Sequence, residues 1–310
     1  MNPIISLYGG EPLLYGNESN IEYIISKQNQ KKYECLMIVT NLVNIKIFKE
    51  ILQKFKGKLI FKVTLNGDEL LHDTMRKFDN GKGTYQMTLN NMKFVLENLQ
   101  NTLIELSILV DNRIANENIT NLFQDLQTNG FLKNNRVNIK FGHIQFRTQY
   151  ICSGFENRIL NVEDYYPMLY RFQRDNSLIT RDMISGSSMH LLNSIYEVLK
   201  DRKEMVVPCF TGCGAVYPCF DCVGMDGYSI GNYRKQGLYF YENYKLWKDF
   251  DVTKLQKCME CKFIGFCNGS CLTSNKSKCG NLMDPYCENV EASINKFLEY
   301  CYEEKLFDEL

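Results

Sequence analysis

The feature that most constrains this chain is a run of cysteines near its C-terminal end. Cys258, Cys261, Cys267 and Cys271 follow the spacing CxxC-x5-C-x3-C, and Cys287 comes after fifteen further residues. A buried cysteine in a core acts as a small hydrophobe, which does not explain four thiols within fourteen residues. Such short offsets are typical of a segment that wraps around a metal ion or an iron–sulfur cluster.

Cysteine is also the outlier of the composition. The chain has 310 residues and 13 cysteines, ten of them from Cys209 to Cys287. The sequence shows no signal-peptide pattern and no apolar run of about 18 residues. We therefore expect metal-bound thiolates in the reducing cytoplasm rather than a secreted disulfide scaffold. The formal net charge of zero argues against a nucleic-acid or membrane partner.

The first half of the chain alternates between strand and helix patterns. Apolar runs predict five strands, at residues 3–8, 35–39, 59–65, 103–110 and 137–144. Helical spacing of apolar residues predicts helices at 21–27, 45–55, 85–99, 119–126, 165–174, 188–200 and 290–304. Repeated strand–helix units predict an α/β fold with a parallel sheet, either open or closed into a barrel.

Polar residues follow the predicted strands, at the edge where parallel sheets bind ligands. The first strand ends in Gly9-Gly10-Glu11-Pro12. Two glycines let a backbone approach a ligand closely, and a carboxylate can accept hydrogen bonds from an ammonium group. The alternative is that this sequence is only a turn.

Together these stretches resemble radical S-adenosylmethionine (SAM) enzymes that carry a C-terminal SPASM domain. Leu7–Leu14 (LYGGEPLL) resembles the second barrel strand of that family. Val63–Asp73 (VTLNGDELLHD), followed by Gly81–Tyr85 (GKGTY), is similar to the fourth-strand region. The Cys258–Cys287 spacing and the G-x4-C of Gly214–Cys219 match the SPASM signature. Only four residues separate Cys209 from Gly214, where relatives have a longer hairpin.

The resemblance implies a partial (β/α)6 barrel at 1–150, a helical bridge at 151–205 and a SPASM iron–sulfur domain at 206–310. It implies that Gly9, Gly10 and Glu11 bind the SAM amino group, and that two auxiliary [4Fe–4S] clusters are present. Cys258, Cys261, Cys267 and Cys287 would hold one cluster, and Cys209, Cys219 and Cys271 the other. Cys213 is the favoured fourth ligand of that second set, and Cys222 is its rival.

The expected function is modification of a peptide or protein substrate by a radical SAM maturase. The family's CxxxCxxC, which binds the SAM-reducing cluster, does not occur in the sequence. This absence predicts an incomplete enzyme that depends on a missing N-terminal segment for SAM cleavage. One alternative is an iron–sulfur protein for electron transfer or peptide binding. Another is a domain stabilised by two zinc ions, because CxxC pairs also bind zinc.

Other chemically active side chains are assigned to packing. Cys35 and Cys301 lie in apolar patterns and are expected in the core. Cys152 and Cys279 are expected to bind nothing, and the alternative for Cys279 is a substitute ligand in a rearranged site. His72 is expected to be a hydrogen-bonded structural histidine. The aromatic residues Tyr239, Phe240, Tyr241, Tyr244 and Trp247 are expected to pack in the core, with a peptide-binding wall as the alternative.

Overall fold

The computed structural model describes residues 4–31, 34–143, 160, 162–180, 182–184, 206–234, 237–267, 269–287, 290–303 and 305. The chain divides into two compact units. The first comprises residues 1–144 and 169–187, and the second comprises residues 145–168 and 188–310. The expected helix at 188–200 and Cys152 lie outside the described residues.

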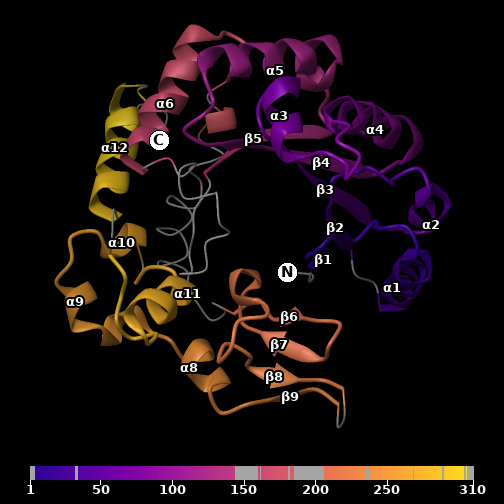
Figure 1. The fold of residues 1–310 in the computed structure, drawn as a ribbon. Coiled ribbons are helices and arrows are strands. Elements are labelled where there is room, and N and C mark those ends of the chain that lie inside the picture. The colour runs from indigo at the N-terminus through magenta and orange to yellow at the C-terminus, as the bar shows by residue number, and fades with distance from the viewer. Residues whose placement is uncertain are drawn as a thin grey trace. The chain divides into compact units, whose positions relative to one another are not determined.

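The first unit is an α/β structure built on a five-stranded sheet (Figure 1). Its elements are, in order, β1 (Ile4–Leu7), α1 (Glu18–Lys31), β2 (Cys35–Val39), α2 (Lys49–Gln53), β3 (Lys58–Leu65), α3 (Glu69–Met75), α4 (Tyr85–Asn98), β4 (Thr102–Val110), α5 (Asn116–Thr128), η1 (Phe131–Lys133) and β5 (Val137–His143). Helix α6 (Val162–Asp175) spans the sequence boundary between the two units.

The sheet is parallel throughout, and its strands follow the order β1-β2-β3-β4-β5. This confirms the predicted α/β class and the five strands. All five carboxyl ends lie at one edge, since the strands point the same way, so the residues that follow them are neighbours.

The two faces of the sheet differ because side chains alternate along each strand. Alternate residues of β4, from Thr102 to Val110, are buried, and those between them are only partly buried. Figure 1 shows helices α1 to α5 along one side of the strands. The other face carries polar side chains in register, including Lys62 opposite Glu105 and Thr64 opposite Ser107. A polar face of this kind is better suited to binding a ligand than to packing against a hydrophobic core.

The prediction that Cys35 is a core thiol was wrong. Leu36 and Ile38 are fully buried, whereas Cys35 is only partly buried. The period-two alternation of the strand places Cys35 on the opposite face from Leu36 and Ile38. An apolar run therefore predicted the strand correctly but not the side to which this thiol points.

Helix α3 was not predicted, and it explains the two motifs around it. Asp68 caps its N-terminus, where its side chain accepts a hydrogen bond from Leu71 N. Asp73 Oδ1 accepts hydrogen bonds from Thr84 N (2.8 Å) and Tyr85 N (3.0 Å) at the start of α4. A Cβ at Gly83 would lie 1.7 Å from Asp73 Oδ2. The histidine–aspartate and glycine–threonine–tyrosine motifs thus fasten α3 to α4.

The second unit combines a small antiparallel sheet with short helices. Its elements are β6 (Cys209–Phe210), β7 (Ala215–Tyr217), η3 (Phe220–Cys222), β8 (Gly231–Asn232), β9 (Tyr239–Phe240), α8 (Tyr244–Lys248), η4 (Val252–Lys254), α9 (Gln256–Met259), α10 (Ile264–Cys267), α11 (Leu272–Ser274), the π-helical η5 (Asn275–Cys279) and α12 (Val290–Glu303). The sheet order is β6-β7-β8-β9. A Cβ at Gly231 would meet Tyr239 O at 2.5 Å, so only glycine allows this strand pairing.

Sulfur atoms form part of the small core of this unit. Cys222 and Cys258 are buried there with aromatic and aliphatic side chains such as Trp247 and Ile230, and Cys209 and Cys219 pack against them. Small cores with few apolar side chains are usually supplemented by metals or disulfides. The twelve cysteines of the described part are all free thiols.

No helix in the described part of the chain is both long and apolar enough to cross a bilayer.

Candidate functional site

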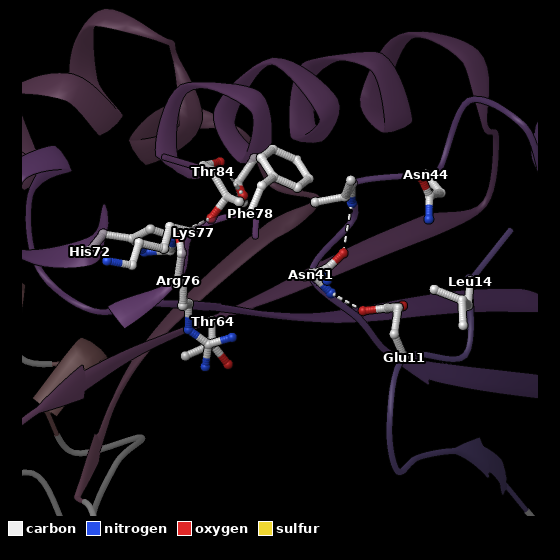
Figure 2. A pocket seen from close by; sticks show the side chains of 12 residues that line it. Glu11, Leu14, Asn41, Asn44, Thr64, His72, Arg76, Lys77, Phe78 and Thr84 are labelled. Atoms are coloured by element: carbon white, nitrogen blue, oxygen red, sulfur yellow. Dashed lines mark hydrogen bonds between the residues drawn. The ribbon is translucent and has the colours of Figure 1, made fainter. Parts of the chain in front are cut away.

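A pocket of about 390 Å³ opens beside the carboxyl ends of the first strands (Figure 2). Its walls come from the segments after β1 and β2, from Thr64 of β3, and from the segment that joins α3 to α4. Glu11 and Asn41 lie on one side of the pocket, and Arg76 lies beside Thr64 on the other (Figure 2). The pocket therefore presents an anionic wall and a cationic wall.

Glu11 is held in place by the end of β2. Its Oε1 accepts hydrogen bonds from Leu13 N (3.0 Å) and Thr40 Oγ1 (2.5 Å), and its Oε2 accepts one from Asn41 N (2.8 Å). A carboxylate has about four lone-pair positions. These three bonds orient the group and leave acceptor capacity for a ligand, so Glu11 serves both the turn and the pocket.

Gly9 and Gly10 have positive φ angles of 94° and 57°. Side chains other than glycine rarely adopt this conformation. A Cβ at either position would have nothing within 4 Å. Conformation rather than crowding thus calls for glycine here, and open space remains beside the backbone for a ligand.

Arg76 faces Glu11 from the far wall. Burial lowers the pKa of the Arg76 guanidinium, and the negative charge of Glu11 opposes that shift. Arg76 Nε donates to Asn66 Oδ1 at 2.6 Å, which fixes the plane of the guanidinium. A carboxylate and a guanidinium facing each other across one pocket fit the ammonium and carboxylate groups of an α-amino acid.

His72 completes a closed ring of hydrogen bonds behind Arg76. Asn66 N donates to His72 Nδ1 (3.3 Å), His72 Nε2 lies 3.2 Å from Thr84 Oγ1, and Thr84 Oγ1 donates to the Arg76 carbonyl (2.6 Å). Burial lowers the pKa of His72 to about 4. A neutral ring with the proton on Nε2 satisfies every bond. This confirms the expected structural histidine and shows what it supports.

Only the wall of this pocket that contains Glu11 was predicted from the sequence. Glu11 was predicted to bind a ligand, whereas Asn41, Thr64 and Arg76 were not singled out. Arg76 follows a helix that the pattern did not predict, so no sequence signal pointed to it.

Four predicted cluster ligands lie near one another in the second unit. The Cys258 thiol is buried in α9, and Cys267 ends α10. Burial raises the pKa of Cys258, and negative charge on Cys267, Cys287 and Cys261 would raise it further. Cys261, Cys267 and Cys287 are thus the thiols whose charges act on Cys258.

The other set is gathered at the end of the β6–β7 hairpin. Burial raises the pKa of Cys209 to about 11, with a further contribution from negative charge on Cys219. Cys219 in turn lies near Cys271, whose charge contributes to its raised pKa. The favoured fourth residue, Cys213, is an exposed thiol 3.0 Å from Thr211 Oγ1. Cys222 is buried and lies near Cys219 and Cys209.

Within the described residues, no three His, Cys, Asp or Glu side chains meet closely enough to enclose a single metal ion. The two cysteine sets are looser groupings. Thiolate-only donor sets at these offsets fit an iron–sulfur cluster, which is larger than one ion and takes a thiolate at each of its irons.

The predictions of core packing for the remaining thiols and aromatic residues are partly confirmed and partly wrong. Cys301 is buried on α12, as expected, and burial raises its pKa to about 11. Trp247 is buried in the core, but Tyr239, Phe240 and Tyr241 are 41%, 37% and 40% exposed. The expectation of core packing is therefore wrong for these three, and Phe240 instead stacks on Tyr244 with ring centroids 4.1 Å apart.

Comparison with solved structures establishes the class of fold. The structure of native anSMEcpe with bound AdoMet superposes with a TM-score of 0.68 at 17% identity, over 97% of this chain and 82% of that one. Native anSMEcpe with bound AdoMet and Kp18Cys peptide gives a TM-score of 0.66 at 17% identity, over 99% of this chain and 86% of that one. A scan against models of protein families found no match.

Sequence relatives then specify the group. The chain is 24% identical to a cysteine-type anaerobic sulfatase-maturating enzyme of Clostridium novyi (strain NT), over 95% of this chain and 80% of that enzyme. It is 25% identical to the radical SAM cyclopropyl synthase TigE of Paramaledivibacter caminithermalis, over 95% of this chain and 59% of TigE. The chain thus has homologues among radical SAM maturases of the SPASM type over nearly its full length, at low identity.

Proposed function

We propose that this chain supplies the SAM-binding and auxiliary-cluster parts of a radical SAM maturase of the SPASM type that modifies a peptide or protein substrate, while SAM cleavage needs a CxxxCxxC motif that these 310 residues do not contain. The observation that carries the proposal is the cysteine array of the second unit, whose members gather in two sets. The relatives support it, since one matures sulfatases and the other is a cyclopropyl synthase. The structures with AdoMet and peptide bound to a protein of the same fold support it as well.

In this proposal the first-unit pocket binds the amino-acid part of SAM. Glu11 accepts hydrogen bonds from the ammonium group, Arg76 binds the carboxylate, and the backbone at Gly9 and Gly10 leaves room for the ligand. The bound cofactor supplies the radical chemistry. The protein supplies orientation, through the fixed Glu11 and the Arg76 held by Asn66.

In the second unit we propose two [4Fe–4S] clusters held by cysteine thiolates. Cys258, Cys261, Cys267 and Cys287 hold one cluster. Cys209, Cys219 and Cys271 contribute to the other.

The pocket is tested by the binding of SAM against 5′-methylthioadenosine, which lacks the amino-acid part. We expect SAM to bind more tightly, and Glu11→Gln and Arg76→Met each to weaken SAM binding by roughly 10- to 100-fold, since a hydrogen bond to a charged group is worth ~1.5–3 kcal/mol. Methylthioadenosine binding should hardly change. Isothermal titration calorimetry on the full chain measures both ligands.

Glu22→Gln and Arg174→Met are matched controls, because both side chains are exposed and neither lines the pocket. Glu22 pairs with Lys54, and Arg174 pairs with Asp175 and lies over the Tyr170 ring. Equal affinity for the two ligands, or equal losses for both in the pocket variants, would refute recognition of the amino-acid part.

A further inference from the structure

We infer that Cys222, rather than Cys213, is the fourth thiolate of the cluster bound by Cys209, Cys219 and Cys271. The inference rests on the proposed function, since it assigns a ligand to one of the proposed clusters. Four observations carry it: the position of Cys222, the side chain that Cys219 and Cys222 share as a neighbour, the position of Cys213, and a cation near Cys222.

Cys222 closes a short turn directly after Cys219. It ends η3, and its Sγ lies 3.2 Å from the Cys219 carbonyl oxygen. Its side chain is fully buried in the small core that Cys209 and Cys219 border. Two thiols separated by two residues on such a turn are a common chelating pair. Cys219 and Cys222 therefore form a local chelate that points inward.

The hairpin and α11 bring the other two thiols to the same place. Cys209 pairs with Tyr217 in the β6–β7 register, so Cys219 follows at the same end of the hairpin as Cys209. Cys271 is the N-cap residue of α11. The buried side chain of Thr273, two residues later, lies within hydrogen-bonding reach of both Cys219 and Cys222. Thr273 thus places the segment that carries Cys271 next to Cys219 and Cys222.

Cys213 lies at the other end of the hairpin. It sits in the turn closed by the hydrogen bond from Gly214 N to Thr211 O (2.9 Å). Its thiol is exposed and lies near Thr211 and Arg234. Strands rise ~3.3 Å per residue, which puts this turn roughly 7 Å or more beyond the Cys209 end. Cys213 thus lies at the turn of the hairpin, whereas Cys209 and Cys219 lie at its open end.

Lys276 places a cation near Cys222. Its ammonium lies close enough to feel the Cys222 charge, packs 4.4 Å from the Tyr228 ring centroid, and donates to Gly227 O. Lys276 forms no ion pair with a carboxylate among the described residues. Four thiolates give a cluster a net negative charge, and a partly buried cation beside one sulfur offsets it.

The decisive experiment is chemical labelling of the intact holoprotein. The full chain is loaded with iron and sulfide under anaerobic conditions, treated with iodoacetamide, and mapped by mass spectrometry. We expect Cys213 to be alkylated while the iron content stays the same, and Cys222 to react only after the clusters are removed. Protection of Cys213 that disappears together with the iron would overturn the inference.

Variants give a second readout. Cys222→Ala should lower bound iron from about eight per chain toward about four, at ~4 irons per cube, or leave a three-iron cluster with its own electron paramagnetic resonance signal. Cys213→Ala and Cys279→Ala should keep about eight irons. Full iron in Cys222→Ala together with a loss in Cys213→Ala would contradict the inference. If Cys222→Ala fails to fold, the labelling result decides.

Different results would refute the proposed clusters and the assignment of Cys222 as a ligand. Wild-type protein that binds zinc, or no metal, would refute the proposed clusters themselves. Wild-type protein that binds two cubes with Cys213 protected would refute only the assignment of Cys222.

Discussion

At the residue scale, hydrogen bonds between polar side chains fix the orientation of the residues that line the pocket. Arg76 is a ligand-facing residue whose direction is set by Asn66, His72 and Thr84. Each hydrogen bond in that ring contributes ~1 kcal/mol, and leaving one buried partner unsatisfied costs more. A neutral His72 is therefore a condition for a correctly placed Arg76.

This neutrality makes the first unit sensitive to acid. The folded pKa of His72, about 4, lies below its ordinary 6.5. The unfolded state therefore binds a proton first, and stability falls as pH drops from about 6.5 toward 4. Between pH 7 and pH 5 the loss should be about 2 kcal/mol. Hydrogen exchange of α3 amides should show it.

His72→Gln keeps a polar side chain at this position and removes the titration. Its α3 amides should be less protected than wild type at pH 7, and the difference should shrink by pH 5. A pH dependence that is the same in both proteins would assign the effect to another group.

At the element scale, a single buried amide ties the cysteine-bearing segments together. Asn275, at the start of η5, is fully buried. Its Nδ2 donates to Gly269 O (3.0 Å) and Leu282 O (3.3 Å), and its Oδ1 accepts from Tyr286 N (2.9 Å). These bonds join the turn between Cys267 and Cys271 to the residue just before Cys287. Asn275 thus holds the segment that follows Cys267 and the segment that precedes Cys287 in place relative to each other.

Asn275→Ala should loosen the segment that carries Cys287. Three bonds are lost, and three backbone groups lose their partner, those of the buried Gly269 and Leu282 and of the partly buried Tyr286, at a cost of roughly 2–4 kcal/mol. We expect bound iron to fall from about eight toward about four per chain, since ~4 irons form a cube. Iron analysis and thermal unfolding measure both effects.

Asn281→Ala is the matched control, because that exposed side chain accepts only a local hydrogen bond from Met283 N. It should keep its iron and its melting temperature. An Asn275→Ala protein with wild-type iron content would show that the loops are held by other means.

The sequence predicted the elements well where pattern and packing agree. Buried apolar runs marked β2 to β5 nearly to the residue, because apolar strands between polar turns have few alternatives. Helix α3 was missed because its seven residues begin directly after a turn, and its N-cap Asp68 looked like part of that turn. Because Arg76 directly follows this helix, the wall of the pocket that contains Arg76 was not predicted either. The choice between Cys213 and Cys222 depends on the β6–β7 register, which cysteine spacing does not contain.

At the scale of the whole molecule, the first unit contains the pocket proposed for SAM and the second contains the cysteines proposed to bind the clusters. The 310 residues contain no CxxxCxxC, the motif with which radical SAM enzymes bind the SAM-reducing cluster. Tested alone with SAM and a strong reductant, this polypeptide should form no 5′-deoxyadenosine. Liquid chromatography detects the product, and its formation would show that SAM cleavage here needs no such motif.

The most direct test of the account is the metal content of the wild-type chain purified without oxygen. We predict a brown protein with about eight irons and about eight sulfides per chain, from two cubes. A colourless protein with about two zinc ions, one per four thiolates, would contradict it.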